Sequence, residues 1–143
     1  MTETLDSLKA RYPGAVTYKF GNTPELSDIL VGLVRAGKKR ATCISQHAVD
    51  KGEALPVVGR CDIVVDFDEV PQLVTRTLEL VPLRFCDMTE EKALMEGEDE
   101  SLDGWRHQHE TYYRRMGIFD PEMQLYWERF EVVEDLVHGA AHD

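Results

Sequence analysis

The chain has 143 residues, 43% of them hydrophobic, and a formal net charge of -11. This length suits one compact domain with one core, and two independent domains are not expected. The negative charge argues against a protein that follows a long nucleic acid duplex, because such proteins carry a basic surface along the phosphates. Charges interrupt every apolar run within a few residues, so no membrane-spanning segment and no membrane partner are expected.

The N-terminal stretch MTETLDSLKA lacks the basic start and apolar run of a secretory signal. Cys43, Cys61 and Cys86 are odd in number and show no CxxC spacing. We therefore expect free thiols in a reducing compartment and a cytoplasmic location. The five histidines show no HExxH or comparable pattern, so neither a metal site nor a cofactor is expected.

Two helices are expected before residue 40. A short one falls within residues 1–11, and residues 12–22 form turns around a brief extended piece. Thr23 can cap the second helix, Pro24 suits its first position, and Gly37 suits its C-terminal end. Its apolar residues recur at helical spacing: Leu26, Ile29, Leu30, Leu33 and Val34.

The charge pattern changes after this helix, in the nine residues GKKRATCIS at 37–45. Three adjacent cations precede the small and β-branched residues of a strand expected at 40–45. Together with Arg35 they form a cationic island, whereas residues 87–103 hold eight acidic residues and one lysine. Any nucleic acid contact should therefore be local, at a single strand, an end or one nucleoside.

The remaining chain predicts strands and helices in blocks. The expected elements are a loop at 50–59, strands at 60–68 and 71–85, helices at 89–97 and 101–117, and a closing strand within 120–136. In the helix at 101–117 we place Leu102, Trp105, Tyr112 and Met116 near one face. This order favours an α+β domain with a small, mostly antiparallel sheet or barrel.

Lys39 and Thr42 are the first candidate pair for chemistry. A threonine hydroxyl becomes a nucleophile when a nearby base removes its proton. A lysine can be that base where burial or neighbouring cations lower its pKa, and Lys38 and Arg40 are such neighbours. The alternative is a solvated cationic helix end followed by an edge-strand threonine.

Glu96 precedes a glycine between the two later helices. It can orient the lysine or accept a proton from an exocyclic amine, or it can be one more solvated acid of an acidic segment. The aromatic residues of the second half can stack on bases, although their spacing is more typical of a core. They are Trp105, Tyr112, Tyr113 and Trp127. Neither a phosphate-binding glycine loop nor a GxSxG elbow is present.

Three blocks in this order, GKKRATCIS, EGEDESLDGWRHQH and LYWERFEVVE, resemble the ASCH domain family in its small stand-alone bacterial branch. The likeness covers residues 19–136. It leaves 1–18 as an N-terminal helix and turn and 137–143 as a flexible tail. The resemblance implies a PUA-like β-barrel with flanking helices around a cleft, and RNA or nucleotide-related ligands.

Some ASCH members are amidohydrolases that remove the acetyl group from acetylcytidine, and others are described as ribonucleases. Matched by position, the resemblance implies that Lys39 is the general base, Thr42 the nucleophile and Glu96 the carboxylate that completes the site. The expected ligand-binding residues are Arg40, Ser45 and Trp105.

One position departs from the family pattern. Ile44 occupies a place where the wider family often has an arginine that can bind a phosphate or a base edge. The leading hypothesis is a hydrolase of an acylated, cytidine-like base, with a modified nucleoside or short single-stranded RNA as partner. The alternatives are a binding module without chemistry, a ribonuclease, and a protein whose acidic segment at 87–103 docks a basic surface. The oligomeric state stays open.

Overall fold

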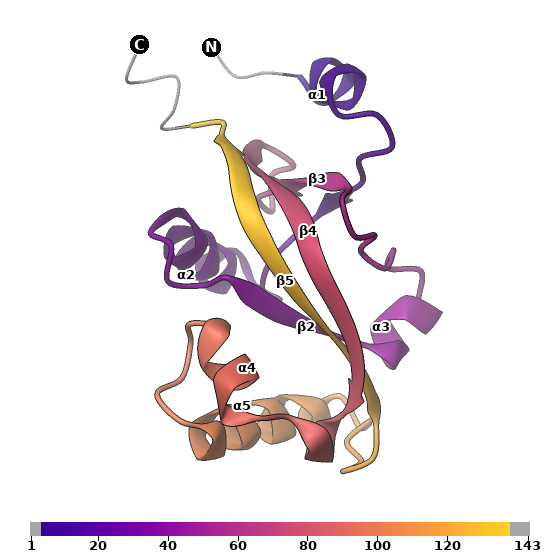
Figure 1. The fold of residues 1–143 in the computed structure, drawn as a ribbon, viewed down its shortest axis with the longest axis vertical. Coiled ribbons are helices and arrows are strands. Elements are labelled where there is room, and N and C mark those ends of the chain that lie inside the picture. The colour runs from indigo at the N-terminus through magenta and orange to yellow at the C-terminus, as the bar shows by residue number, and fades with distance from the viewer. Residues whose placement is uncertain (1–3, 138–143) are drawn as a thin grey trace.

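The structure is a computed structural model that describes residues 4–137. It is an α+β domain, as expected (Figure 1). The strands are β1 (Thr17–Tyr18), β2 (Ala41–Ser45), β3 (Cys61–Val65), β4 (Pro71–Arg84) and β5 (Gln124–Asp135). The helices are α1 (Leu5–Arg11), α2 (Pro24–Arg35), α3 (Gln46–Asp50), α4 (Glu90–Met95) and α5 (Leu102–Arg115), with one 3-10 turn η1 (Phe85–Asp87). Of the tail expected at 137–143, all but the first residue lie outside the described range.

One five-stranded sheet organises the domain, in the order β1-β3-β4-β5-β2. The pair β1 and β3 is parallel, and the other three pairs are antiparallel. The long strands β4 and β5 run side by side along most of the molecule (Figure 1). Since β1 and β2 are the two edges and do not pair with each other, the expected barrel is open rather than closed.

Helix α2 begins and ends where the sequence predicts. The Thr23 side chain accepts a hydrogen bond from the backbone N–H of Leu26, and Pro24 is the first helical residue. Gly37 follows the helix with a φ of 78°, which a residue with a side chain adopts only at a cost. The inner face of α2, with Leu30, Val31 and Val34, packs into a core with Phe20 and Phe130 of the sheet side.

The caps of α4 and α5 are also confirmed, with Thr89 and Ser101 accepting backbone hydrogen bonds. The face of α5 that is predicted to carry Leu102, Trp105, Tyr112 and Met116 is buried only in part. Trp105 and Tyr113 are buried, eight residues apart on one helical stripe, whereas Tyr112 and Met116 are 40% and 42% exposed. The side of α5 that contains Trp105 and Tyr113 packs against the sheet. Which side of the helix is buried depends on tertiary contacts that the sequence pattern does not show.

Two separate cores lie on the two faces of β2 and β5. On one face, Leu125 and Trp127 of β5 pack with Trp105 and its neighbours. On the other face, Phe130 packs with α2. Because side chains alternate along a strand, neighbouring residues of β2 point into different surroundings, with Thr42 on the Phe130 face and Cys43 on the Trp127 face.

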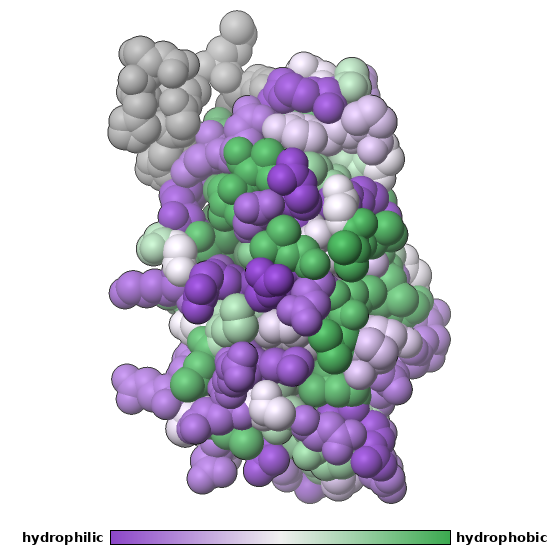
Figure 2. All heavy atoms as spheres, viewed as in Figure 1, coloured by the Kyte–Doolittle hydropathy of each residue, from purple (hydrophilic) through white to green (hydrophobic). Residues whose placement is uncertain are grey.

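The surface is mixed in character. Figure 2 shows polar and charged side chains over much of the face in view, with hydrophobic side chains gathered toward its right side. Among the residues that the structure describes, no helix combines the length and apolar character needed to cross a membrane.

Candidate functional site

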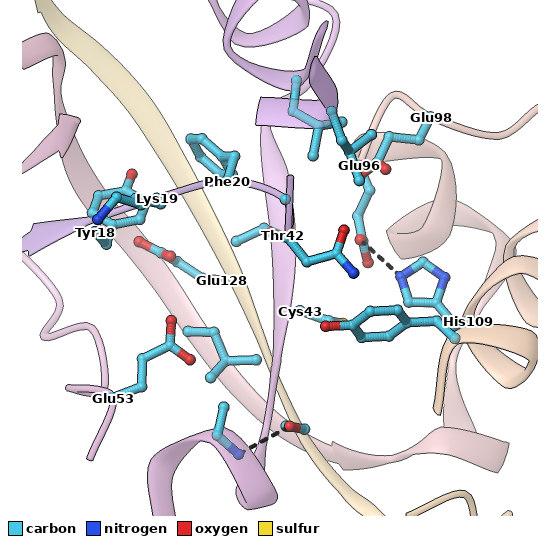
Figure 3. A pocket seen from close by; sticks show the side chains of 18 of the residues that line it. Tyr18, Lys19, Phe20, Thr42, Cys43, Glu53, Glu96, Glu98, His109 and Glu128 are labelled. Atoms are coloured by element: carbon cyan, nitrogen blue, oxygen red, sulfur yellow. Dashed lines mark hydrogen bonds and ion pairs between the residues drawn. The ribbon is translucent and has the colours of Figure 1, made fainter. Parts of the chain in front are cut away.

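A cleft of about 850 Å³ opens between the two edge strands of the sheet. Tyr18 and Phe20 lie at its β1 side, and Thr42 lies at its β2 side (Figure 3). Helices α2 and α5 contribute further walls. The cleft exists because the sheet does not close, which leaves a gap between β1 and β2.

The lining of this cleft is acidic. It contains six carboxylate side chains, from Glu53, Asp62, Glu96, Glu98, Asp99 and Glu128. Lys19 and Arg115 are the lysine and arginine residues among the described lining residues. Carboxylates accept hydrogen bonds and repel phosphates, so the cleft suits a ligand that presents N–H or O–H donors.

Lys39 is buried, with a relative exposure of 1%. Its Nζ donates to the backbone oxygen of Ala41 at 2.9 Å, to that of Glu96 at 3.1 Å, and to Oε2 of Glu98 at 2.6 Å. It also lies 5.8 Å from the ring centroid of Phe20. An ammonium has three protons, and all three have acceptors here. Lys39 therefore ties the start of β2 to the segment after α4.

A glycine makes this arrangement possible. Gly97 has a φ of 75°, and a Cβ built on it would lie 2.7 Å from the carbonyl carbon of Lys38 and 2.8 Å from the Cα of Lys39. The turn after α4 thus packs directly on the backbone that leads into β2. This contact brings the Glu96 carbonyl within reach of the Lys39 ammonium.

The Glu96 carboxylate lies on the α5 side of β2. It is 1% exposed, accepts a hydrogen bond from Nε1 of Trp105 at 3.0 Å, and lies 3.8 Å from Nε2 of His109 (Figure 3). Burial raises the pKa of Glu96, an effect that the charges of Lys39 and His109 oppose. Burial and the adjacent Glu96 raise the pKa of the Cys43 thiol well above its usual value, so this thiol stays protonated.

Thr42 faces the opposite side of the strand. Its side chain lines the cleft, and no residue in the described range exchanges a hydrogen bond with its hydroxyl. Its partner in the sheet register is Glu128 of β5. Directly opposite residues of an antiparallel pair project from the same face with Cβ atoms about 4.5–5.5 Å apart. Sequence reasoning missed Glu128, although an acid at an inward position of a closing strand was visible in LYWERF.

Glu128 is an acid with few compensating contacts. It is 4% exposed, and its Oε2 accepts a hydrogen bond from Oγ1 of Thr77 at 2.7 Å. Burial raises the pKa of Glu128 to about 7, and the nearby Asp62 carboxylate adds to this. The Thr77 hydroxyl and the charges of Arg60 and Lys39 act in the opposite direction. This carboxyl therefore changes charge near neutral pH.

We expect Glu128→Gln to change how the stability depends on pH. The pKa is 4.5 for the ordinary side chain and about 7 in the fold, so the native state holds the extra proton between these values. The wild type should lose about 3 kcal/mol of unfolding free energy as pH rises through this window, and the neutral glutamine should not. Urea denaturation at about pH 4.5 and pH 8 measures both.

The matched control is Glu131→Gln on the same strand, an exposed residue in an ion pair with Arg76. This variant should follow the wild-type pH dependence. An identical pH dependence for wild type and Glu128→Gln would contradict the raised pKa of Glu128.

The remaining sequence candidates lie apart from one another. Arg40 lines a second hollow of about 360 Å³ rather than the cleft. Ser45 lines the cleft, but its hydroxyl accepts a hydrogen bond from the Ala48 backbone and caps α3, a helix that the sequence did not predict. Trp105 is fully buried and supports Glu96. No cluster of three or more metal-binding side chains occurs within residues 4–137.

Comparison with known proteins gives the family. A family model described as "ASCH domain" matches residues 16–134. The ASCH domain crystal structure from Lactobacillus crispatus JV V101 is similar with a TM-score of 0.74 and 25% identity, covering 92% of this chain and 86% of that one. Protein EF3133 from Enterococcus faecalis V583 is similar with a TM-score of 0.76 and 29% identity, covering 89% and 80%.

A third structure, hypothetical protein PH0355, shares the fold with a TM-score of 0.53 and 12% identity, over 83% of this chain and 97% of that one. Among curated proteins, none matches this chain. The family match spans most of the sequence, and it includes the segments that carry Lys39, Thr42, Glu96 and Glu128. The chain therefore belongs to the ASCH domain family, whose PUA-like modules generally bind RNA.

Proposed function

We propose that the cleft takes one nucleobase, as a free nucleoside or an unpaired base of RNA, and removes an acyl group from its exocyclic amine. The observation that carries this proposal is the Thr42 hydroxyl, which has no hydrogen-bond partner in the described part of the chain and lines a cleft rich in carboxyl groups. A hydroxyl next to potential proton acceptors is the arrangement that acyl transfer through a covalent intermediate requires.

The character of the cleft supports a base as ligand. Its volume of about 850 Å³ lies within the range of small-molecule sites. The carboxyl groups can accept hydrogen bonds from amino and imino groups of a base edge, and the half-exposed ring of Tyr112 offers a surface for stacking. The net charge of -11 opposes binding of a long phosphate backbone.

A ribonuclease is less well supported by this lining. Six carboxylates face two basic side chains in the cleft, and a cleaved phosphate would be repelled. Cleavage of a ribonucleotide strand that fails on its 2′-deoxy counterpart would favour the ribonuclease over the amide hydrolase.

A second candidate is base binding without chemistry. It is favoured by Lys39, because the three protons of its Nζ already have acceptors and none of these is Thr42. In this case the lysine has a purely structural role. The two candidates predict the same ligand class and differ in whether product forms.

The experiment is an assay of the purified protein with acetylcytidine and a panel of other acylated cytidines, with products separated by chromatography. We expect turnover by the wild type and a fall of at least about 100-fold in Thr42→Val, which keeps the shape and removes the hydroxyl. Thr42→Ser keeps a hydroxyl and should recover a large part of the rate. Calorimetric titration should give similar Kd values for all three proteins.

The outcomes separate the candidates. No turnover by the wild type, together with measurable binding of cytidine or single-stranded RNA, would leave only the binding module. Full turnover by Thr42→Val would exclude the covalent mechanism. Absence of both turnover and binding would overturn the proposed ligand class.

A further inference from the structure

We propose that Glu128 is the proton acceptor for the Thr42 hydroxyl. This inference rests on the proposed hydrolase function and assigns a residue that the family motif around Lys39 does not include. It follows from the sheet register, from the burial of Glu128, and from the hydrogen bonds that occupy the other candidates.

The register places the two groups side by side. Thr42 and Glu128 are opposite partners on β2 and β5, and both line the cleft. Since opposite residues share a face, the two side chains leave the sheet on the same side, and the Glu128 carboxyl extends toward Tyr18 (Figure 3). Figure 3 shows Glu128 on one side of β2, with Glu96 and His109 on the other side. Of Glu96 and Glu128, Glu128 is thus the one that lies on the Thr42 side of β2.

The Glu128 carboxyl is held in place with one oxygen available. Oε2 accepts the hydrogen bond from Thr77, whereas Oε1 has no hydrogen-bond partner among residues 4–137. The neighbouring acid Asp62 is already engaged, by two bonds from Arg60 and one from the backbone of Val16. Of the two buried acids Asp62 and Glu128, Glu128 is therefore the one that has an oxygen without a hydrogen-bond partner in this range.

The other two candidates are occupied elsewhere. The Nζ of Lys39 already donates to the carbonyl oxygens of Ala41 and Glu96 and to Oε2 of Glu98, and it is not hydrogen-bonded to Thr42. Glu96 accepts from Trp105 and lies near Cys43, on the face of β2 opposite to Thr42. Both groups then support the site, Lys39 by holding the Glu96 segment against β2.

The proposed reaction has two steps. In the first, the hydroxyl proton of Thr42 moves to Glu128, and Oγ1 bonds to the acyl carbon. The bond from that carbon to the amine nitrogen then breaks, and the amine takes the proton from Glu128. In the second, a water molecule gives a proton to Glu128, and the water oxygen bonds to the acyl carbon. The bond from that carbon to Oγ1 of Thr42 then breaks, and Thr42 regains the proton from Glu128. The products are the free amine and a carboxylic acid, and no other reactant is needed.

The charged surroundings of Glu128 determine when it can act. Asp62 and Arg60 lie on the β3 side, Lys39 approaches from the start of β2, and Tyr18 of β1 experiences the Glu128 charge. A base must be ionised in the free enzyme, and the pKa of Glu128 is about 7. We therefore expect kcat/KM to rise with pH through about 7 and to level off above it.

The test compares wild type with Glu128→Gln and Glu128→Asp on an acylated cytidine, over a range of pH. Glutamine keeps the size and can still accept from Thr77, so the fold and the Kd for cytidine should persist, as circular dichroism and titration would show. We expect kcat/KM of Glu128→Gln to fall at least about 100-fold, and the limb near pH 7 to disappear from the residual rate. Glu131→Gln is the control for the strand.

Each outcome has a separate meaning. A Glu128→Gln rate within threefold of wild type would overturn the inference while leaving the hydrolase intact. A reduced rate that keeps the pH limb would overturn it also, because another group would then be the base. Partial activity of Glu128→Asp, with the rise of kcat/KM shifted to a different pH, supports the assignment. If the wild type shows no turnover of any acylated cytidine, the hydrolase function itself is wrong. The inference about Glu128 is then wrong as well.

Discussion

The Gly97→Ala variant is expected to lose about 4 kcal/mol of unfolding free energy, the sum of overpacking and an unfavourable backbone conformation. The new Cβ would overlap the Lys38 carbonyl group and lie 2.8 Å from the Cα of Lys39. These are backbone atoms and cannot rotate away, so the turn after α4 must move. Urea denaturation gives the free energy, and turnover or titration with cytidine gives the effect on the cleft.

Gly117 is the matched control. It has the same φ of 75°, but an added Cβ would meet nothing within 4 Å. Gly117→Ala should cost about 1 kcal/mol from the backbone alone. The difference between the two variants isolates the contact of Gly97 with the start of β2. Equal losses in both would show that this contact does not matter.

The Lys39→Met variant is expected to lose about 2 to 4 kcal/mol of unfolding free energy, because each buried carbonyl oxygen that loses its donor costs about 1–3 kcal/mol. Methionine fills a similar volume, but the carbonyl oxygens of Ala41 and Glu96 lose their donor and Glu98 loses its cation. Both carbonyls then lie buried without a partner, which accounts for part of the cost. The free energy of unfolding in urea measures the effect.

Lys38→Met controls for the charge of the segment. Lys38 is exposed and adjacent to Lys39, so its replacement should change the free energy by no more than about 0.5 kcal/mol. A comparable loss in both variants would contradict the buried clamp. Because Lys39→Met is expected to be this unstable, a loss of its activity does not identify Lys39 as the base. The Glu128 variants test which residue is the base.

Local signals in the sequence predicted most of the elements. The caps Thr23, Thr89 and Ser101 fall where the hydroxyl residues of the sequence indicated. Caps are local, because the side chain bonds to a backbone group three residues away. The sequence does not predict helix α3, because its five residues are too few to show a period. The hydroxyl of Ser45, a predicted ligand-binding residue, caps that helix.

The candidate site was predictable only in its local part. The motif around residue 39 drew attention to Lys39 and Thr42, which are three residues apart. Glu128 is far from both along the chain, and its position beside Thr42 depends on the register of β2 with β5. Register depends on the whole sheet, so no window of sequence contains it. The open edge between β1 and β2, which forms the cleft, also follows from strand pairing alone.

The pairing of β2 with β5 has a consequence for how the protein is made. β2 ends at Ser45 and its only partner strand within the described range begins at Gln124. A ribosome that has released the first hundred residues has therefore produced Thr42 without the strand that holds it. Contacts this distant in sequence are slow to form, because a long loop must close first. The Thr42 hydroxyl thus lacks its β5 neighbours until the strand that begins at Gln124 has been made, and a shorter chain lacks this side of the cleft.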